Sequence, residues 1–193
     1  MFEYIKGTIT VLAPTHCVIE ASGVGYLINI SLTTFSDLRE GAEIKLLVHP
    51  IYREDAQQLY GFTTENERTL FRSLIGVSGV GANTARMMLS SMVPSELINA
   101  IVTEQVGILK GIKGIGLKTA ERIIVDLKDK LKQISITGEI MTPQGNTMNE
   151  EALSALMMLG FPRKPAEKVI GQILKSNSGL SVEAIIKQAL KQL

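Results

Sequence analysis

The stretch VSGVGANTA (Val77–Ala85) decides the fold of the middle of this chain, because it recurs as IKGIGLKTA (Ile112–Ala120) 35 residues later. Both copies have the pattern apolar-x-Gly-apolar-Gly-x-x-x-Ala, and Leu74 and Leu109 precede them at the same distance. Glycine allows a tight turn that a Cβ would obstruct, and alanine is small where two helices pack. The repeat predicts two helical hairpins in tandem, of the helix-hairpin-helix type.

Each predicted turn leads into a helix whose first N–H groups have no partner inside the helix. Together with the positive end of the helix dipole, such groups attract phosphate. Lys113, Lys118 and Arg122 lie beside the second turn, and their charges would strengthen a phosphate contact and make it sensitive to salt. The candidate DNA-contacting residues are Ser78, Gly79, Val80, Gly81, Asn83, Thr84, Lys113, Gly114, Ile115, Gly116, Lys118, Thr119 and Arg122.

Two nucleotide-binding motifs resemble this glycine pattern without matching it. A dinucleotide-binding loop needs a preceding strand and a third glycine, whereas here the flank is helical in pattern and an alanine occupies that end. In a P-loop the lysine follows the second glycine directly, but Leu117 separates Gly116 from Lys118. The other alternative is a pair of purely structural turns, against which two copies with matched flanks favour a phosphate-binding site.

The charges of the chain are unevenly distributed, although the net charge is only +1. Residues 1–63 hold four Lys and Arg against seven Asp and Glu, residues 64–135 hold ten against seven, and residues 136–193 hold six against five. The basic charge is therefore concentrated in the segment that contains both hairpins. This distribution is a modest indication of a polyanion-binding site there.

The N-terminal segment reads as short strands separated by turn residues. The predicted strands cover residues 2–12, 16–21, 24–31, 43–51 and 57–62. Five strands in about 60 residues fit an OB-type barrel, a frequent nucleic-acid platform. A small barrel without any ligand is the alternative interpretation.

Helical patterns follow from Thr64 onward. Thr64-x-x-Glu67 is a capping box, and Ser95 after Pro94 is a predicted N-cap. The predicted helical segments are 68–76, 82–92, 95–104, 106–111 and 117–131. In the C-terminal part, Asn149 and Ser181 are predicted caps of the first and last of three short helices.

The sequence therefore predicts an α+β multidomain fold. Its parts are a five-stranded OB-type β-barrel (1–63), a central all-α tandem helix-hairpin-helix domain (64–132), a flexible linker (133–148) and a small three-helix domain (149–193). In the last of these we expect a core of Leu153, Leu156, Leu159, Val169, Ile173 and Ile185. The candidate partner-facing residues there are Met157, Met158, Phe161 and Pro162, because methionine-rich surfaces adapt to partners.

Several classes of function are disfavoured by composition. Cys17 is the single cysteine, so an intrachain disulfide or a cysteine zinc site is excluded, and His16 and His49 have no partners at metal-ligand spacing. The N-terminus does not read as a signal peptide, and no run reaches the roughly 18 apolar residues of a membrane span. We therefore expect a cytoplasmic protein with no metal, no cofactor and no membrane partner.

An ordered set of segments resembles one known family. These are EYIKGTI (Glu3–Ile9), YREDAQQLYGF (Tyr52–Phe62), the two hairpins and EALSALMMLGF (Glu151–Phe161). In this order they resemble the RuvA family of bacterial Holliday junction branch-migration subunits. The resemblance covers nearly the whole chain.

The resemblance implies a non-enzymatic DNA-binding subunit that acts in homologous recombination, DNA repair and the SOS response. It implies a homotetramer, or two tetramers paired as an octamer, that holds an open four-way junction through the hairpins. It also implies that the C-terminal domain binds the hexameric ATPase RuvB and that the resolvase RuvC acts on the same junction. Glu54 and Asp55 match the family's acidic pin, whereas from the residues alone they read as an ordinary acidic turn.

Two other functions compete with this interpretation. Lys118 sits where some helix-hairpin-helix glycosylases carry a Schiff-base lysine, but Asp126 and Asp129 lie on the same predicted helix, not at the expected distance downstream. A general adaptor would bind single strands by stacking bases on aromatic side chains. Five Phe, four Tyr and no Trp leave few side chains for that purpose.

Overall fold

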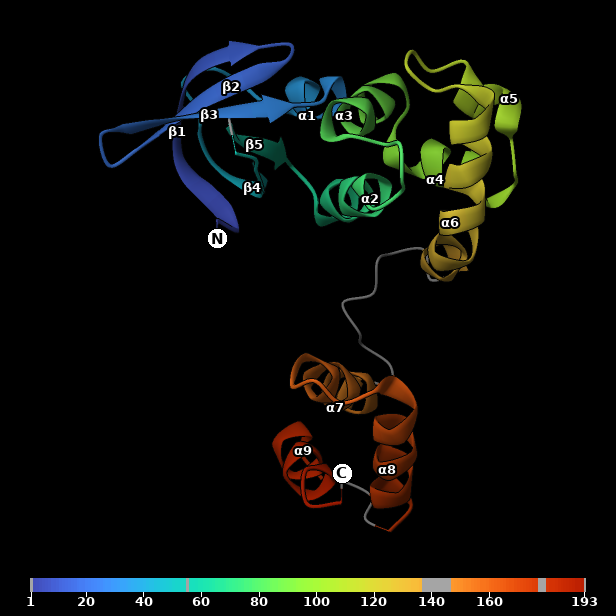
Figure 1. Cartoon of the computed structure of the whole chain (residues 1–193). Helices are drawn as coiled ribbons and strands as arrows, with labels where there is room; N and C mark the ends of the chain where they lie inside the picture. The colour runs from blue at the N-terminus through green and yellow to red at the C-terminus, as the bar shows by residue number, and fades with distance from the viewer. Residues whose placement is uncertain (1, 55, 137–146, 177–179, 193) are drawn as a thin grey trace. The chain divides into compact units, whose positions relative to one another are not determined.

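The computed structural model describes residues 2–54, 56–136, 147–176 and 180–192 (Figure 1). The chain forms two compact units, Met1–Ile140 and Met141–Leu193. The predicted barrel and the predicted hairpins both belong to the first unit. The predicted linker overlaps the ends of two helices, which extend to Ile136 and from Thr147, and its residues 137–146 lie outside the described residues.

The first unit begins with a closed five-stranded barrel of strand order β1-β2-β3-β5-β4. Its strands are β1 (Tyr4–Ala13), β2 (His16–Ala21), β3 (Val24–Ile30), β4 (Glu43–Tyr52) and β5 (Gln57–Phe62). β3 and β5 pair in parallel, and the other neighbours pair antiparallel. Alternate residues such as Ile19, Ile28 and Leu46 fill the interior. The predicted five-stranded OB-type barrel is confirmed.

A short helix that the sequence pattern did not predict, α1 (Leu32–Asp37), connects β3 to β4. Ser31 caps it by accepting a hydrogen bond from the Thr34 backbone N–H. With six residues, α1 is too short to show a helical period in the sequence.

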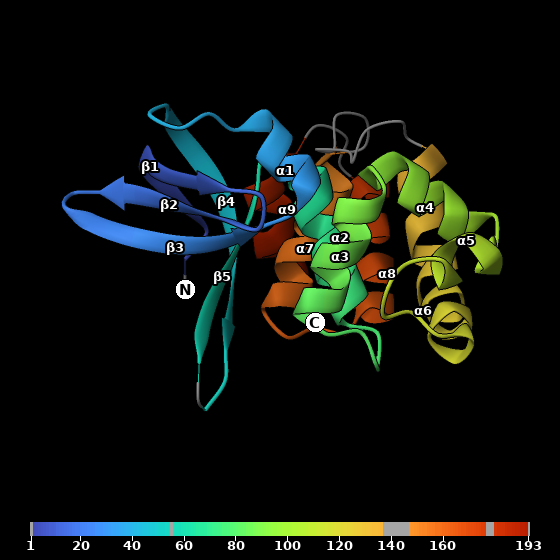
Figure 2. The same ribbon diagram turned by 90° about the horizontal axis from the view of Figure 1, so that it is seen from above.

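Five helices complete the first unit. They are α2 (Glu65–Ile75), α3 (Ala82–Ser91), α4 (Pro94–Val102), α5 (Val106–Lys110) and α6 (Leu117–Ile136). Figures 1 and 2 show α2 and α3 between the barrel and the group α4 to α6. The predicted cap at Ser95 is wrong: α4 begins at Pro94, with Val93 as its N-cap. Proline suits the first turn because its missing N–H would have no partner there.

The interior of the barrel and the helices form two separate hydrophobic clusters, and the end of β5 belongs to the helical one. Tyr60 and Phe62 of β5 lie in the same buried cluster as the helices. The Phe71 ring of α2 is 5.1 Å from the ring of Tyr60 and 5.0 Å from that of Phe62, measured between centroids. Aromatic contacts of this kind hold α2 against the end of the barrel.

A buried carboxylate connects α2 to α1. Glu67 is 1% exposed, and its two oxygens accept hydrogen bonds from Ser31 Oγ at 2.5 Å and Thr34 Oγ1 at 2.7 Å. Burial raises the pKa of the Glu67 carboxyl, while the two hydrogen bonds act in the opposite direction. The predicted capping box is therefore only half correct. Thr64 accepts from the Glu67 N–H, but the Glu67 side chain turns to α1.

Two arginines add polar contacts between the helices and the barrel. Arg68 is buried and donates to Glu65 at 2.6 Å and to the Glu3 carboxylate at 2.7 Å. This guanidinium lowers the pKa of Glu3. Arg86 of α3 donates to the Thr15 carbonyl in the β1–β2 turn at 2.8 Å. The orientation of α2 and α3 against the barrel is thus set at several points.

The second unit consists, in its described residues, of α7 (Thr147–Met158), α8 (Arg163–Ser176) and α9 (Val182–Ala189). The predicted three-helix architecture is confirmed, and Ser181 caps α9 as expected. The predicted cap at Asn149 is wrong, because α7 begins two residues earlier. Of the predicted core, Leu153, Leu156, Ile173 and Ile185 are buried and Val169 packs against them.

The end of α7 explains one wrong core prediction. Gly160 has φ +95°, and its N–H donates to Met157 O while the Phe161 N–H donates to Leu156 O. This is a Schellman turn, which brings the residue after the glycine back onto the helix. Leu159 is consequently 60% exposed, and Phe161 packs against the core instead.

The hydrogen bonds of the buried Glu67 carboxyl group with Ser31 and Thr34 lead to a prediction about stability and pH. Because the pKa of Glu67 is raised in the folded state, its contribution to stability is complete below its ordinary value of 4.5 and is lost as the pH rises through the folded value. The free energy of unfolding of the wild type should therefore fall, relative to Glu67→Gln, as the pH rises above about 4.5. Urea unfolding followed by tyrosine fluorescence measures this, since all four Tyr lie in the barrel segment.

The exposed Glu40→Gln variant is the control and should keep the pH dependence of the wild type. A difference between wild type and Glu67→Gln that stays constant with pH would contradict the prediction.

Candidate nucleic-acid interface

The two predicted hairpins have the same backbone geometry. In the first, Gly79 has φ +90°; in the second, Gly114 has φ +93°. Val80 N donates to Val77 O at 3.0 Å, as Ile115 N does to Ile112 O. The sequence repeat is therefore also a structural repeat, in which α2 and α3 form one hairpin and α5 and α6 form the other.

The apolar residues of each turn are buried. Val80 and Ile115, which lie between the glycines, point into the core. Their backbone N–H groups donate within the turn. Among the candidate DNA-contacting residues, these two have side chains that support the turn from inside.

The two glycines of each hairpin have different roles. Gly79 and Gly114 adopt a positive φ that other residues rarely tolerate. Gly81 has an ordinary φ of −84°, and a Cβ at Gly81 or Gly116 would meet no atom within 4 Å in the described part of the chain. Glycine there leaves the space in front of the first N–H groups of α3 and α6 open to an outside ligand.

The two hairpins differ in charge. Ser78 and Asn83 of the first hairpin correspond to Lys113 and Lys118 of the second, and all four side chains are exposed. Arg122, one turn further along α6, is also exposed and lies 3.7 Å from Asp126. The first hairpin therefore offers neutral hydrogen-bonding groups, and the second adds positive charge to the same backbone geometry.

The first hairpin is connected to the barrel by a hydrogen bond that the sequence did not indicate. The Tyr60 hydroxyl of β5 donates to Asn83 Oδ1 at 3.2 Å and also lies 3.0 Å from Gln58 Oε1. Burial raises the pKa of Tyr60. Neither Tyr60 nor Arg86 was among the candidate residues, because their partners are 23 and 71 residues away and no local pattern shows such contacts.

The predicted acidic turn lies between β4 and β5. Arg53 N donates to Ala56 O at 2.8 Å and closes the turn. Glu54 is exposed, and Asp55 lies outside the described residues. Figure 2 shows the turn-side ends of β4 and β5 projecting to the same side of the unit as the α2–α3 connection.

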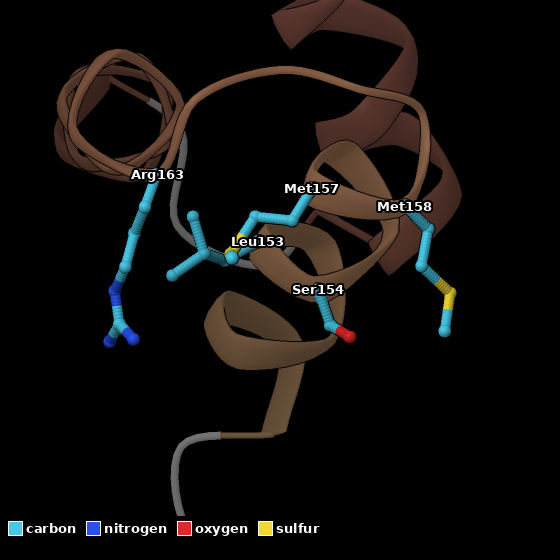
Figure 3. Close-up of a pocket in the computed structure, with 5 residues that line it drawn as sticks. All are labelled: Leu153, Ser154, Met157, Met158 and Arg163. Atoms are coloured by element: carbon cyan, nitrogen blue, oxygen red, sulfur yellow. The ribbon is translucent and has the colours of Figure 1, made fainter. Parts of the chain in front are cut away.

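The second unit carries a groove of about 560 Å³ lined by Leu153, Ser154, Met157, Met158 and Arg163 (Figure 3). Leu153 and Met157 lie side by side, and Met158 points away from them. Met157 is 45% and Met158 88% exposed. Of the other candidate partner-facing residues, Pro162 is exposed and Phe161 is half-buried.

The described residues contain no cluster of three or more His, Cys, Asp or Glu suited to a metal ion. Lys118 is exposed at the start of α6, whereas a Schiff-base lysine is activated by desolvation or by a neighbouring cation. No helix in the described ranges is long and apolar enough to cross a membrane.

Comparison with known proteins agrees with this architecture. Three family models match: the RuvA N terminal domain over residues 1–61, the SAM-like helix-hairpin-helix tandem over 71–129, and the RuvA C-terminal domain over 147–193. The chain is 49% identical over 193 residues to the Holliday junction branch migration complex subunit RuvA of Christiangramia forsetii. It is 48% identical over 201 residues to that of Bacteroides fragilis and 49% over 202 residues to that of Porphyromonas gingivalis. Each of the three alignments covers 100% of both chains.

The different roles of the glycines lead to a prediction about stability. Gly79→Ala and Gly114→Ala should each lower the free energy of unfolding by about 1–2 kcal/mol, because a Cβ disfavours positive φ. Gly81→Ala and Gly116→Ala should lower it by a smaller amount, about 0.5 kcal/mol, because no positive φ is involved and the cost is only that of alanine in place of glycine at the start of a helix. Urea unfolding followed by tyrosine fluorescence measures all four.

Gly107→Ala on the exposed first turn of α5 is the matched control and should be neutral or slightly stabilising. Equal destabilisation by all four hairpin variants would show that the assignment of separate roles is wrong.

Proposed function

The chain belongs to the RuvA family, and from this premise we propose that it binds four-way DNA junctions as the non-catalytic subunit of a branch-migration complex. The observation that carries the proposal is the pair of hairpins with equal backbone geometry and open helix N-termini. Two such sites, held in one rigidly packed unit, can contact phosphates at two positions of the same DNA arm. Recognition then depends on backbone position and DNA shape and not on base sequence.

Each hairpin contacts phosphate oxygens through the first N–H groups of its second helix. In the first hairpin, Ser78, Asn83 and Thr84 add neutral polar groups. In the second, Lys113, Lys118 and Arg122 add cations, and Thr119 adds a hydroxyl. Gly81 and Gly116 let the backbone approach closely, so the N–H groups and the helix dipole act on the phosphate at short range.

The acidic turn repels the phosphates that the hairpins attract. Glu54 and Asp55 repel phosphate, so they exclude a DNA backbone from one place and direct it to another. In a homotetramer, or in two tetramers face to face, the fourfold axis brings these turns together at the centre of the junction. There they separate strands as these exchange, while Arg53 offsets part of their charge.

Energy for strand exchange comes from a partner, the hexameric ATPase RuvB, which the second unit recruits. The exposed thioethers of Met157 and Met158 beside Leu153 support this role, because methionine adapts to the shape of a partner surface. Pro162 and Phe161 complete the docking region. The resolvase RuvC acts on the same junction, in the cytoplasm, during recombination, DNA repair and the SOS response.

The proposal predicts a preference for branched DNA. In a competition gel shift at fixed salt, the protein should bind a four-way junction more tightly than duplex or single strand of matched length. The Gly81→Ala, Gly116→Ala double variant should bind the junction at least about tenfold more weakly, because a hydrogen bond to a charged group contributes about 1.5 kcal/mol. Gly107→Ala should bind as the wild type does, and equal affinity of the wild type for all three DNAs would contradict the proposal.

Because only the second hairpin carries lysines at these positions, changes in the two hairpins should affect the salt dependence of junction binding differently. The slope of log K against log salt concentration is negative, and its magnitude should decrease by about 0.9 for each of Lys113→Gln and Lys118→Gln, since each lost phosphate contact leaves one counterion on the DNA. Ser78→Ala, at the corresponding place in the first hairpin, should leave the slope unchanged. Slopes that respond equally to changes in both hairpins would refute the assignment of cationic contacts to the second.

If Met157 and Met158 dock the partner, changing them should affect branch migration without affecting junction binding. The Met157→Ser, Met158→Ser double variant should keep the junction affinity of the wild type and lose RuvB-stimulated branch migration. Leu190→Ser is the control, because Leu190 is as exposed as Met157, 45%, and lies outside the groove. Full stimulation of the double variant would show that the partner binds elsewhere.

A further inference from the structure

A second groove lies on the wall of the barrel. It has a volume of about 360 Å³, and the residues that line it include Phe2, Tyr26, Leu27, Tyr52, Gln57 and Gln58. β3 pairs with β5 only from Ile28 onward, whereas the preceding part of β3 pairs with β2 alone. The groove therefore opens where β3 and the start of β5 diverge.

The lining of this groove is aromatic and uncharged. Phe2 and Tyr26 meet edge to face with ring centroids 6.2 Å apart. Tyr52 is 56% exposed and Phe2 is also exposed, whereas Phe62 and Phe71 are buried in the core. Gln57 and Gln58 supply amide groups that can donate and accept hydrogen bonds. Rings and amides without charge suit a planar, neutral, heteroaromatic ligand.

The position of the groove connects it to the proposed DNA interface. Tyr52 is the last residue of β4 and Gln57 the first of β5, so they flank the turn that carries Glu54. OB-type barrels generally bind nucleic acid on the surface of strands 2 and 3 and at the loop between strands 4 and 5. The carboxylate of Glu54 disfavours a phosphate at this edge but not a neutral base.

We propose that this groove binds a single unpaired nucleobase, stacked against Tyr52 and the Phe2–Tyr26 pair. The inference rests on the proposed function, because strand exchange breaks base pairs at the crossover and so exposes unpaired bases beside the acidic turn. The small number of aromatic residues argued against base stacking at the level of sequence. The structure changes this argument, since three of the nine Phe and Tyr side chains converge on one groove.

A junction that carries one unpaired 2-aminopurine at its crossover tests the proposal. Compared with a fully paired junction of the same arms, the full-length protein should bind it about fivefold or more tightly, as base–aromatic stacking would provide. It should also quench the 2-aminopurine fluorescence. Tyr52→Ser and, separately, Phe2→Ser should abolish the preference and the quenching but keep the affinity for the paired junction. Tyr4→Ser, an exposed tyrosine outside the groove, should behave as the wild type does.

The outcomes are distinguishable. Wild-type protein that prefers junctions to duplex but binds both junctions equally, without quenching, overturns the base-binding groove and leaves the proposed function standing. Loss of any preference for junctions over duplex overturns the proposed function itself. A change in molar mass of Tyr52→Ser and Phe2→Ser, measured by light scattering, would assign the groove to contact between copies of this chain and also overturn the proposal.

Discussion

The placement of the first hairpin against the barrel depends on the buried carboxyl group of Glu67. A charged or even protonated carboxyl is costly to bury without partners, and here Ser31 and Thr34 each donate a hydroxyl to it. Both donors belong to the segment that leaves the barrel, while Glu67 belongs to the first helix of the first hairpin. Any other angle between the barrel and α2 would leave the carboxyl and the two hydroxyls unpaired. These hydrogen bonds therefore fix where the first hairpin lies relative to the acidic turn.

The two hairpins have equal backbone geometry, but they differ in charge and in their connection to the barrel. The first is joined to the barrel through Tyr60 and Asn83 and through Arg86, and it is neutral where the second is cationic. A neutral site with a fixed orientation is suited to positioning DNA, and a cationic site is suited to affinity. Duplication of a turn thus supplies geometry, and the residues around it decide what each copy contributes.

Sequence patterns misled where a tertiary contact or a neighbouring residue overrode a local rule. Glu67 matches a capping box, yet its side chain is used by α1. Leu159 continues the apolar run of α7, but the positive φ of Gly160 turns the chain and exposes it. Ser95 is a good cap by residue type, and Pro94 moves the start of the helix one residue earlier.

The sequence by itself determined the strands, the tandem hairpins and the three C-terminal helices, because periodicity, glycine spacing and turn residues are local signals. The repeat and its charges predicted the candidate contacts along the hairpins, and the ordered segments predicted the family. Only the tertiary structure decided which hairpin glycines need a positive φ, how the first hairpin is connected to the barrel, and that three aromatic side chains meet in one groove. The last two features join residues far apart in the chain, and their contacts exist only after the barrel has closed and the helices have packed against it.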